Sequence, residues 1–492
     1  MAALDWLSVI LFFVIMVVIG LWSYKKVGGS SDFFVAGGKL PWWLSGISHH
    51  VSGYSGAVFV GYAALAYTHG FSIYVWWALT ITAAVILGAY IMAPRWARLR
   101  LNYNIESPTE YLSTRYNVPT QQLMAWCGVL LKLFDVGAKW AAIGILLNVF
   151  TGIPIIYGIL ASGIVSLIYI TVGGLWADVW TDFVQFIVQI IAGLVMFFVV
   201  MDLMGGPSSL LGIWDKLPAE NAQWFREPYT LTYVIFYFFV VFLSYNGGTW
   251  NLATRYISAP DGKEAKKSGV LSGVLYLIWP LFLFFPMWAA PLILPGLEDP
   301  SQSYGMLAQE LLPKGLIGLV LAGLFAATMS MTSSDANTIS AVITRDILPV
   351  MSKKYKDITQ KQSLKIARIT TFTFTFITLI IGIQSEQFGG VLGLIISWFG
   401  ALIGPISIPM LLGLFPQFKN SDSKAAISSI LAGLLVFVLT KYVITLPLSL
   451  SIGAPVLVSG IVFIGMGLIN RSKPVPQEVE TLIQAVSAKE AK

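Results

Sequence analysis

Two short stretches place polar residues inside otherwise apolar segments, where they could bind an ion or a polar ligand. The first is SHHVSGYSGAV, residues 48–58, in a segment that is mostly apolar from Trp42 to Tyr67. The second is SYNGGTWN, residues 244–251. Serine, asparagine and glycine at these places favour a break in a helix, and a broken helix exposes carbonyl oxygens that can bind a cation. Close helix packing through small residues is the alternative explanation.

Charged side chains within apolar segments are a second sign of function. The stretch KLFDVGAK carries Lys132, Asp135 and Lys139, and this spacing allows the aspartate to pair with both lysines on one face of a helix. Asp335 has no opposite charge four residues before or after it, so it could neutralise a lysine from elsewhere, bind an ion or carry a proton. A charge at the centre of a membrane span costs at least about 2.5–3.5 kcal/mol, which makes all four residues functional candidates.

The composition predicts elements that would hold these residues in a membrane. The chain has 492 residues, of which 57% are hydrophobic and 11% charged, whereas a soluble domain averages roughly 25% charged residues. A membrane span needs about 20 mostly apolar residues, and windows of that length predict an all-α polytopic membrane protein with thirteen transmembrane helices. The predicted spans are 4–24, 41–68, 70–94, 119–149, 153–172, 175–204, 231–258, 268–294, 314–346, 362–385, 389–416, 424–445 and 448–470.

The distribution of positive charge predicts the orientation of the spans. With thirteen spans, 24 of the 30 lysines and arginines, Arg255 among them, fall in one set of alternate loops. Cytoplasmic loops are the ones enriched in lysine and arginine, so we expect the N-terminus outside and the C-terminus in the cytoplasm. The net charge of +6 then comes from these loops and does not indicate a nucleic-acid partner. The polar, charged tail after Asn470 is expected to be mobile.

The two interrupted stretches also suggest an internal symmetry, because they lie five predicted spans apart. Broken helices at matching positions of two five-helix halves indicate an inverted-repeat transporter. An ion channel, a membrane enzyme and a membrane substrate sensor are the alternatives from other classes. The sequence shows no repeated filter loop, and no motif places a nucleophile beside a base as an enzyme of that kind requires.

Five stretches resemble the sodium/solute symporter family, which includes the sodium–sugar, sodium–proline and sodium–sialate cotransporters. These are SSDFFVAGGKLPWW (30–43), IESPTEYLSTRY (105–116), GGLWADVWTDFVQ (173–185), RYISAPDGKEAKKSG (255–269) and SMTSSDANTISAVITRDI (330–347). The resemblance implies a LeuT-like fold, whose core is a 5+5 inverted repeat. The implied divisions are an extra helix in 1–30, the first repeat in 40–205, the second repeat in 230–417, two further helices in 424–471 and a cytoplasmic tail in 472–492.

The resemblance also implies a sodium site between the first and eighth core helices. The implied ligands are the carbonyl oxygens of Val51, Tyr54 and Ala327 and the hydroxyl of Ser330. Met331 stands where relatives have a second hydroxyl. A thioether is a weak acceptor, and a hard cation prefers oxygen ligands, so this departure puts the affinity or the identity of the ion in doubt.

A second, deeper ion position in some relatives falls on Asp182, Ser333 and Ser334. A bound cation would neutralise Asp182 there, and the alternative is that this aspartate makes only local hydrogen bonds. His49 and His50 lie one turn before the first break. A histidine beside a broken helix is usually a packing residue, but with a nearby carboxylate it can form a proton relay. Proton coupling is therefore the alternative to sodium coupling.

The implied substrate pocket keeps one aromatic residue of the sugar-transporting relatives and loses other contacts. Tyr245 matches their inner aromatic gate, where a stacking ring with a hydroxyl suits a polar ligand. Polar sugar contacts of those relatives are replaced by Val58, Trp77, Phe242 and Tyr276. Four tryptophans either line the pocket, which would suit a ring face or a cation, or lie at the membrane interface; they are Trp76, Trp77, Trp250 and Trp398. The predicted substrate contacts are Ser55, Val58, Trp77, Asp135, Tyr245, Asn246, Trp250 and Tyr276.

The sequence therefore predicts a cation-coupled secondary symporter that imports a small polar organic solute by alternating access. Sodium is the expected coupling ion. Asp135 would accept a hydrogen bond from a sugar hydroxyl or an ammonium group, and together with a lysine it would suit a zwitterion such as an amino acid, so the substrate class stays open. We expect a functional monomer in the lipid bilayer of the cell (inner) membrane, without enzymatic activity.

Overall fold

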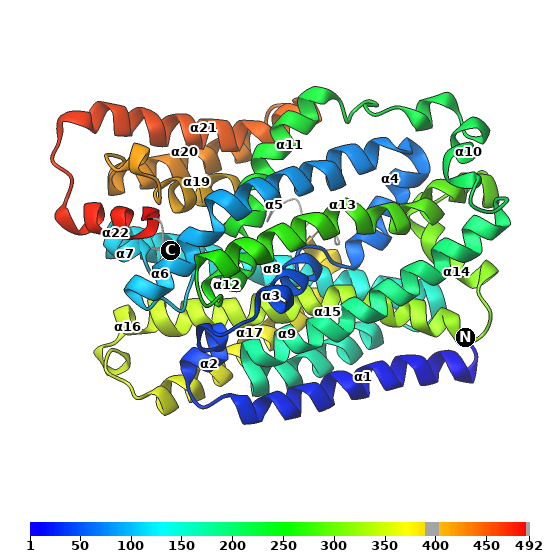
Figure 1. Cartoon of the computed structure of the whole chain (residues 1–492), viewed down its shortest axis with the longest axis horizontal. Helices are drawn as coiled ribbons and strands as arrows, with labels where there is room; N and C mark the ends of the chain where they lie inside the picture. Colours follow the sequence, from blue (N-terminus) through cyan, green and yellow to red (C-terminus); the bar gives the residue numbers. More distant parts are fainter. Residues whose placement is uncertain (389–402, 489–492) are drawn as a thin grey trace.

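The computed structural model describes residues 1–388 and 403–488, and its helices run side by side along the long axis of the molecule (Figure 1). These ranges contain no β-strand, in agreement with the predicted all-α class. The first half of the predicted span 389–416, with Trp398, lies outside the described residues. Nine described helices are long and apolar enough to cross a membrane. They are Ala3–Lys26, Tyr74–Tyr103, Ile155–Leu203, Leu231–Gly248, Gly262–Ile293, Leu316–Met351, Gln360–Ile383, Ser423–Tyr442 and Leu448–Ser472.

The first predicted break is present in the structure. Helix α3 (Trp42–Val51) ends at the polar stretch, and α4 (Gly61–His69) continues the span after a segment that is not α-helical. Glycine is needed at position 53, because a Cβ there would lie 1.9 Å from the hydroxyl oxygen of Tyr276. The prediction of an interrupted helix is therefore confirmed for this stretch, and such a backbone is tolerated at membrane depth only beside protein or a cavity.

The second predicted break is also present. Helix α11 (Leu231–Leu243) passes into a π-helical turn over Ser244–Gly248, and α12 (Asn251–Ile257) follows. Gly247 has a φ of +136°, and Trp250, which is not glycine, has a φ of +70°. A left-handed residue of this kind costs of order 1–3 kcal/mol, and complete burial of the Trp250 side chain helps to offset that cost.

Helix α9 (Ile155–Leu203) accounts for two of the predicted spans. It has 49 residues and a non-helical backbone at Gly174, where φ is +53°. As a straight helix it would be ~73 Å long, more than twice the ~30 Å hydrocarbon thickness of a bilayer. The kink at Gly174 therefore separates two membrane-length helices, which correspond to the predicted spans 153–172 and 175–204.

Helix α15 (Leu316–Val342) is the most deeply buried of the long helices that concern the site. It packs against both α8 (Val118–Thr151) and α9. Helix α3 packs in turn against α9 and against α13 (Gly262–Ile293). The polar residues of α3, α8, α9 and α15 are thereby brought together in the interior of the bundle.

The prediction of a mobile tail is wrong for α22 (Gln477–Ser487). This helix packs against α6 (Ala93–Tyr103) and α7 (Leu112–Arg115) at one end of the molecule (Figure 1). The average polarity of the tail concealed an apolar stripe with i, i+3, i+4 and i+7 spacing, which is typical of an amphipathic helix. The buried members of this stripe are Val479, Leu482, Ile483 and Val486.

Candidate functional site

A cavity of about 390 Å³ lies between the two breaks. The first break lines it through Ser55 and Val58, and the second lines it through Tyr245. Trp77 and Asp135, also predicted as substrate contacts, belong to the same wall. Further aromatic rings and hydroxyls of the described wall are those of Tyr54, Tyr62, Tyr237, Ser52, Ser244 and Thr249. An aromatic wall with a few convergent polar groups is typical of a small-molecule site.

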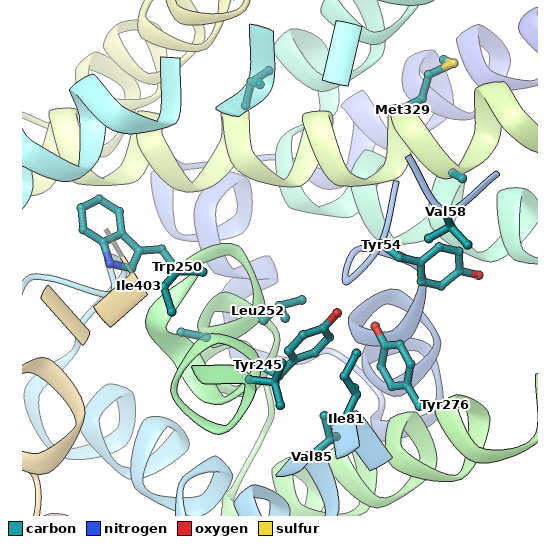
Figure 2. Packing of buried hydrophobic residues seen from close by; sticks show 14 of the residues in the cluster. Tyr54, Val58, Ile81, Val85, Tyr245, Trp250, Leu252, Tyr276, Met329 and Ile403 are labelled. Atoms are coloured by element: carbon teal, nitrogen blue, oxygen red, sulfur yellow. The ribbon is translucent and has the colours of Figure 1, made fainter. Parts of the chain in front are cut away.

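Three tyrosines from different segments lie close together, as Figure 2 shows for Tyr54, Tyr245 and Tyr276, and the first two line the cavity. The hydroxyl of Tyr245 donates a hydrogen bond of 2.8 Å to the carbonyl oxygen of Gly53. This bond joins the second break directly to the first. The Tyr276 hydroxyl donates to the carbonyl oxygen of His50, also at 2.8 Å. Tyr276 therefore helps to stabilise the first break.

We expect the substitution Y245F to raise the KM for the solute about fivefold, because it removes one hydroxyl of the cavity wall, and a hydrogen bond between that hydroxyl and the solute is worth about 1 kcal/mol. The measurement is initial uptake rate against solute concentration. The matched control is Y276F, which removes an equal bond to the same break but no described part of the wall. Equal effects of both variants on KM would contradict a ligand contact by Tyr245.

The other predicted substrate contacts do not line the described cavity. The amide of Asn246 donates to the carbonyl oxygens of Ala84 at 3.0 Å and Phe242 at 2.8 Å. Figure 2 shows the Trp250 ring on the far side of Leu252 from the three tyrosines. The structure thus gives these two residues, like Tyr276, positions that hold the breaks in shape.

Two residues of the cavity wall, Asp135 and Lys139, belong to a ring of four buried charges. Lys139 lies 2.7 Å from Asp135 and 2.7 Å from Asp335, both measured from its ammonium nitrogen to a carboxylate oxygen. Lys132 closes the ring at 2.6 Å from Asp335 and 3.2 Å from Asp135. Their side chains are at most 5% exposed. Asp335 therefore neutralises lysines of another helix, one of the three roles considered, and Asp135 both pairs with its lysines and reaches the cavity.

A second buried cluster surrounds Asp182 on α9. One carboxylate oxygen accepts a hydrogen bond of 2.6 Å from Ser330, and the other accepts one of 3.2 Å from Ser52. Ser48 also donates to this carboxylate. The residues come from the first broken helix, from α9 and from α15, so the structure brings the two predicted ion positions into one hydrogen-bonded group.

Asp178 and Arg255 extend this group, and the sequence analysis did not assign either residue to it. The Arg255 guanidinium lies 2.6 Å from Asp178 and 3.2 Å from Asp182, and all three side chains are 0% exposed. The expectation that Arg255 belongs to a loop is therefore wrong, because α12 carries it into the interior. Two signals were available: Asp178 lies four residues before Asp182 on one helical face, and Arg255 falls within the predicted span 231–258.

The predicted partners Ser333 and Ser334 also belong to this group, and both donate to Asp178. Ser334 donates to Asp178 at 2.9 Å, and its oxygen lies 3.0 Å from that of Ser52. Ser333 donates to the other carboxylate oxygen of Asp178 at 2.5 Å. We name the whole set the aspartate–arginine cluster; it consists of Ser48, Ser52, Asp178, Asp182, Arg255, Ser330, Ser333 and Ser334.

The chemistry of the aspartate–arginine cluster suits a monovalent cation. Counted in their ionised forms, two carboxylates and one guanidinium leave one negative charge in excess. The groups around it are carboxylate and hydroxyl oxygens, which a hard cation prefers. An uncompensated charge in a buried site is costly, and a bound sodium ion would neutralise it.

The remaining implied sodium ligands flank the contact between the first break and α15. The hydroxyl oxygens of Ser52 and Ser330 lie 3.2 Å apart. Val51 and Tyr54 are close to Ser52 in the sequence, and Ala327 is three residues before Ser330 on α15. Met331 lines the solute cavity. Its thioether therefore adds to the apolar wall of the cavity.

The two adjacent histidines serve the first break as packing residues. The ring nitrogens of His49 lie 2.8 Å from the hydroxyl of Ser272 and 3.1 Å from the carbonyl oxygen of Tyr245. The His50 ring packs edge-on against Tyr276, with 4.4 Å between ring centroids. Neither histidine is among the described residues that line the cavity.

A third polar network lies where the 105–116 stretch meets the end of α15. Arg345 lies 2.7 Å from Glu110, and Asp346 accepts hydrogen bonds of 2.5 Å from Ser107 and Thr109. Burial raises the pKa of Glu106 in the same loop, against the opposing effect of nearby Arg345. The loop is thereby fixed to the helix that carries Ser330 and Asp335.

Comparison with known sequences gives consistent matches over most of the chain. Residues 33–433 match the model of the sodium:solute symporter family. The sodium/glucose cotransporter of Vibrio parahaemolyticus is 26% identical, with 89% of this chain and 84% of that protein covered. The sodium/sialic acid symporter of Aliivibrio fischeri is 25% identical, with 85% of this chain and 84% of that protein covered.

Comparison with solved structures gives the fold. A substrate-bound, outward-open state of a Na⁺-coupled sialic acid symporter matches with a TM-score of 0.85 at 20% identity, covering 97% of this chain and 99% of that one. The predicted LeuT-like fold class is therefore confirmed.

Proposed function

Because the chain belongs to the sodium:solute symporter family, we propose that it is a multi-pass membrane transporter that carries sodium and a small polar solute together into the cell. In alternating access, the occupied cavity opens first to one side of the membrane and then to the other. Coupling follows when ion and solute favour the same conformation, because each then raises the affinity of the other by the same factor.

We place the sodium ion between the first break and the aspartate–arginine cluster, with Asp182 and Ser330 as its side-chain ligands. The charge balance of the cluster is the observation that carries this placement, because one negative charge is in excess among buried residues. The carbonyl groups of Val51, Tyr54 and Ala327, which lie within three residues of Ser52 or Ser330 along the chain, would complete an all-oxygen shell. Ser333 and Ser334 then act through Asp178, which they hold by hydrogen bonds.

The proposed solute has several hydroxyl groups and a ring or apolar face, as a sugar has. The rings of Trp77 and Tyr245 provide surfaces for stacking, and Ser55 provides a hydroxyl. Asp135 provides a carboxylate acceptor at the cavity. A zwitterion fits less well, because the ammonium group of Lys139 already has two carboxylate partners at 2.7 Å.

The proposed topology has thirteen spans, with the repeats in 40–205 and 230–417. The nine long apolar helices become thirteen when α9 counts as two spans, when α3 with α4 counts as one, when the charged α8 is added and when the apolar stretch 389–416 is included. In Figure 1 helix α6, which carries three arginines, lies at the same end as α16 (Leu348–Met351), which is followed by Lys353 and Lys354. This supports a cytoplasmic location for that end, and we propose a monomer as the functional unit.

Uptake into proteoliposomes tests the proposal. We expect radiolabelled solute from a panel of sugars, inositols and amino acids to accumulate when an inward sodium gradient is imposed, and only to equilibrate without one. Accumulation driven by a pH gradient in the absence of sodium would overturn sodium coupling in favour of the proton alternative. Sodium flux that does not depend on any solute would indicate a channel.

A further inference from the structure

The charge ring of Lys132, Asp135, Lys139 and Asp335 has an inner and an outer half. Asp135 and Lys139 line the cavity, whereas Lys132 and Asp335 are not among its described lining residues. The two outer residues lie 2.6 Å apart and contact the inner pair at 2.7 Å and 3.2 Å. Each outer residue thus acts on a solute only through an inner residue of opposite charge.

Lys139 alone would make this a site for anions. An ammonium group in the wall of a buried cavity is the usual partner for a carboxylate, and sialic acid, the solute of one relative, carries a carboxylate. In this chain, however, the ammonium group of Lys139 already pairs with two carboxylates, that of Asp135 in the cavity wall and that of Asp335 outside it. An anionic solute would have to compete with both.

The sum of charges leads to the same conclusion. Counted in its ionised form, the ring has two positive and two negative members, and each side chain is at most 5% exposed. Water cannot screen an additional charge at such a site, so a charged solute would be buried there without a counter-ion. A neutral solute meets no such penalty.

We infer that Lys132 and Asp335 are specificity-determining residues that restrict the transporter to solutes with no net charge. The inference rests on the function proposed above and adds to it the charge of the substrate. Loss of Asp335 leaves the ring with one positive charge in excess and favours an anionic solute. Loss of Lys132 leaves one negative charge in excess and favours a cationic one.

The experiment compares four proteins with three probes. The proteins are the unmodified chain, D335N, K132M and the double variant K132M/D335N, whose ring is again neutral. The probes share one sugar ring and differ at a single carbon: glucose is neutral, glucuronate is anionic, and 6-amino-6-deoxyglucose is cationic. Sodium-dependent uptake in proteoliposomes gives kcat/KM for each pair of protein and probe.

We expect the unmodified protein and the double variant to prefer glucose. In D335N the kcat/KM for glucuronate divided by that for glucose should rise at least about tenfold. In K132M the kcat/KM for the amino sugar divided by that for glucose should rise by a similar factor. The reason is that like and unlike charges in a buried contact differ by more than one decade in affinity. A merely structural role of the outer pair would lower all three rates together and keep their order. An unchanged order in both single variants overturns the inference.

Thermal unfolding provides a readout that does not need transport. Acetate in the cavity can pair with the ammonium group of Lys139, which in D335N has lost one of its two carboxylate partners, so sodium acetate should raise the Tm of D335N by about 2 °C or more over sodium chloride. The unmodified protein and the double variant should show no such difference. If no sugar is taken up by the unmodified protein, the proposed solute class fails. The acetate measurement then tests the inference about the ring, and that inference fails if acetate has no selective effect on D335N.

Discussion

Replacement of Arg255 by methionine (R255M) is expected to abolish sodium-driven uptake and to destabilise the protein by about 3–5 kcal/mol, the usual cost of removing one partner from a buried ion pair. The substitution leaves Asp178 and Asp182 side by side without the guanidinium that lies 2.6 Å and 3.2 Å from them. Thermal unfolding in detergent measures the loss of stability. Uptake by reconstituted protein measures the loss of function.

Two variants separate charge from packing in this result. D178N/R255M restores the single excess negative charge of the aspartate–arginine cluster, and we expect it to recover part of the lost stability. R226M is the matched control, because Arg226 also lies 2.6 Å from a carboxylate, that of Glu220, but this pair lies at the surface, with side chains 26% and 64% exposed. An exposed pair contributes only about 0–1 kcal/mol, so R255M and R226M with equal Tm values would contradict the account.

The burial of Arg255 was not predicted from the sequence. Its count among loop cations followed from its place near the end of a predicted span, where lysine and arginine usually mark the cytoplasmic side. The second break shortens the helix that follows it to seven residues, Asn251–Ile257. Residues near its end are therefore still inside the bundle, and this consequence of the break could have been drawn from the sequence.

The breaks themselves were predictable because they depend on local composition. Glycine at 53 and 247 permits a close approach and a positive φ that few other residues tolerate. The pairing of Asp135 with Lys132 and Lys139 was predictable for the same kind of reason, since it follows from spacing along one helix.

Contacts between distant segments were not predictable in this way. Asp335 reaches two lysines that are 203 and 196 residues away in the chain, and no local pattern encodes which lysines a carboxylate will meet. The contributions of Asn246, Trp250 and Tyr276 to the breaks, outside the described cavity wall, likewise depend on how α5 (Thr80–Ile91), α8 and α13 pack around them. The ligand contacts predicted for these residues rested on residue type and on the family resemblance.

The charge of Asp182 should decide whether sodium binds. D182N keeps the size of the side chain and an acceptor for the hydroxyl of Ser330, which now lies 2.6 Å from the carboxylate. It removes the excess negative charge of the cluster. Cation affinity depends steeply on the number of charged ligands, so we expect the sodium concentration for half-maximal uptake to rise about 100-fold or more, equivalent to roughly 3 kcal/mol.

The decisive measurement for D182N is stabilisation by sodium in the absence of solute, because it reports ion binding without transport. Sodium should raise the Tm of the unmodified protein over choline or potassium, and it should leave that of D182N unchanged. D5N is the control: Asp5 is a fully buried aspartate that accepts hydrogen bonds from the backbone of Gly315 and Gly318, outside the aspartate–arginine cluster. Since D5N loses a buried charge but no proposed ion ligand, it should melt earlier and still respond to sodium. A sodium response that survives in D182N would move the ion away from this aspartate and leave the carbonyl groups of the first break, with Ser330, as its site.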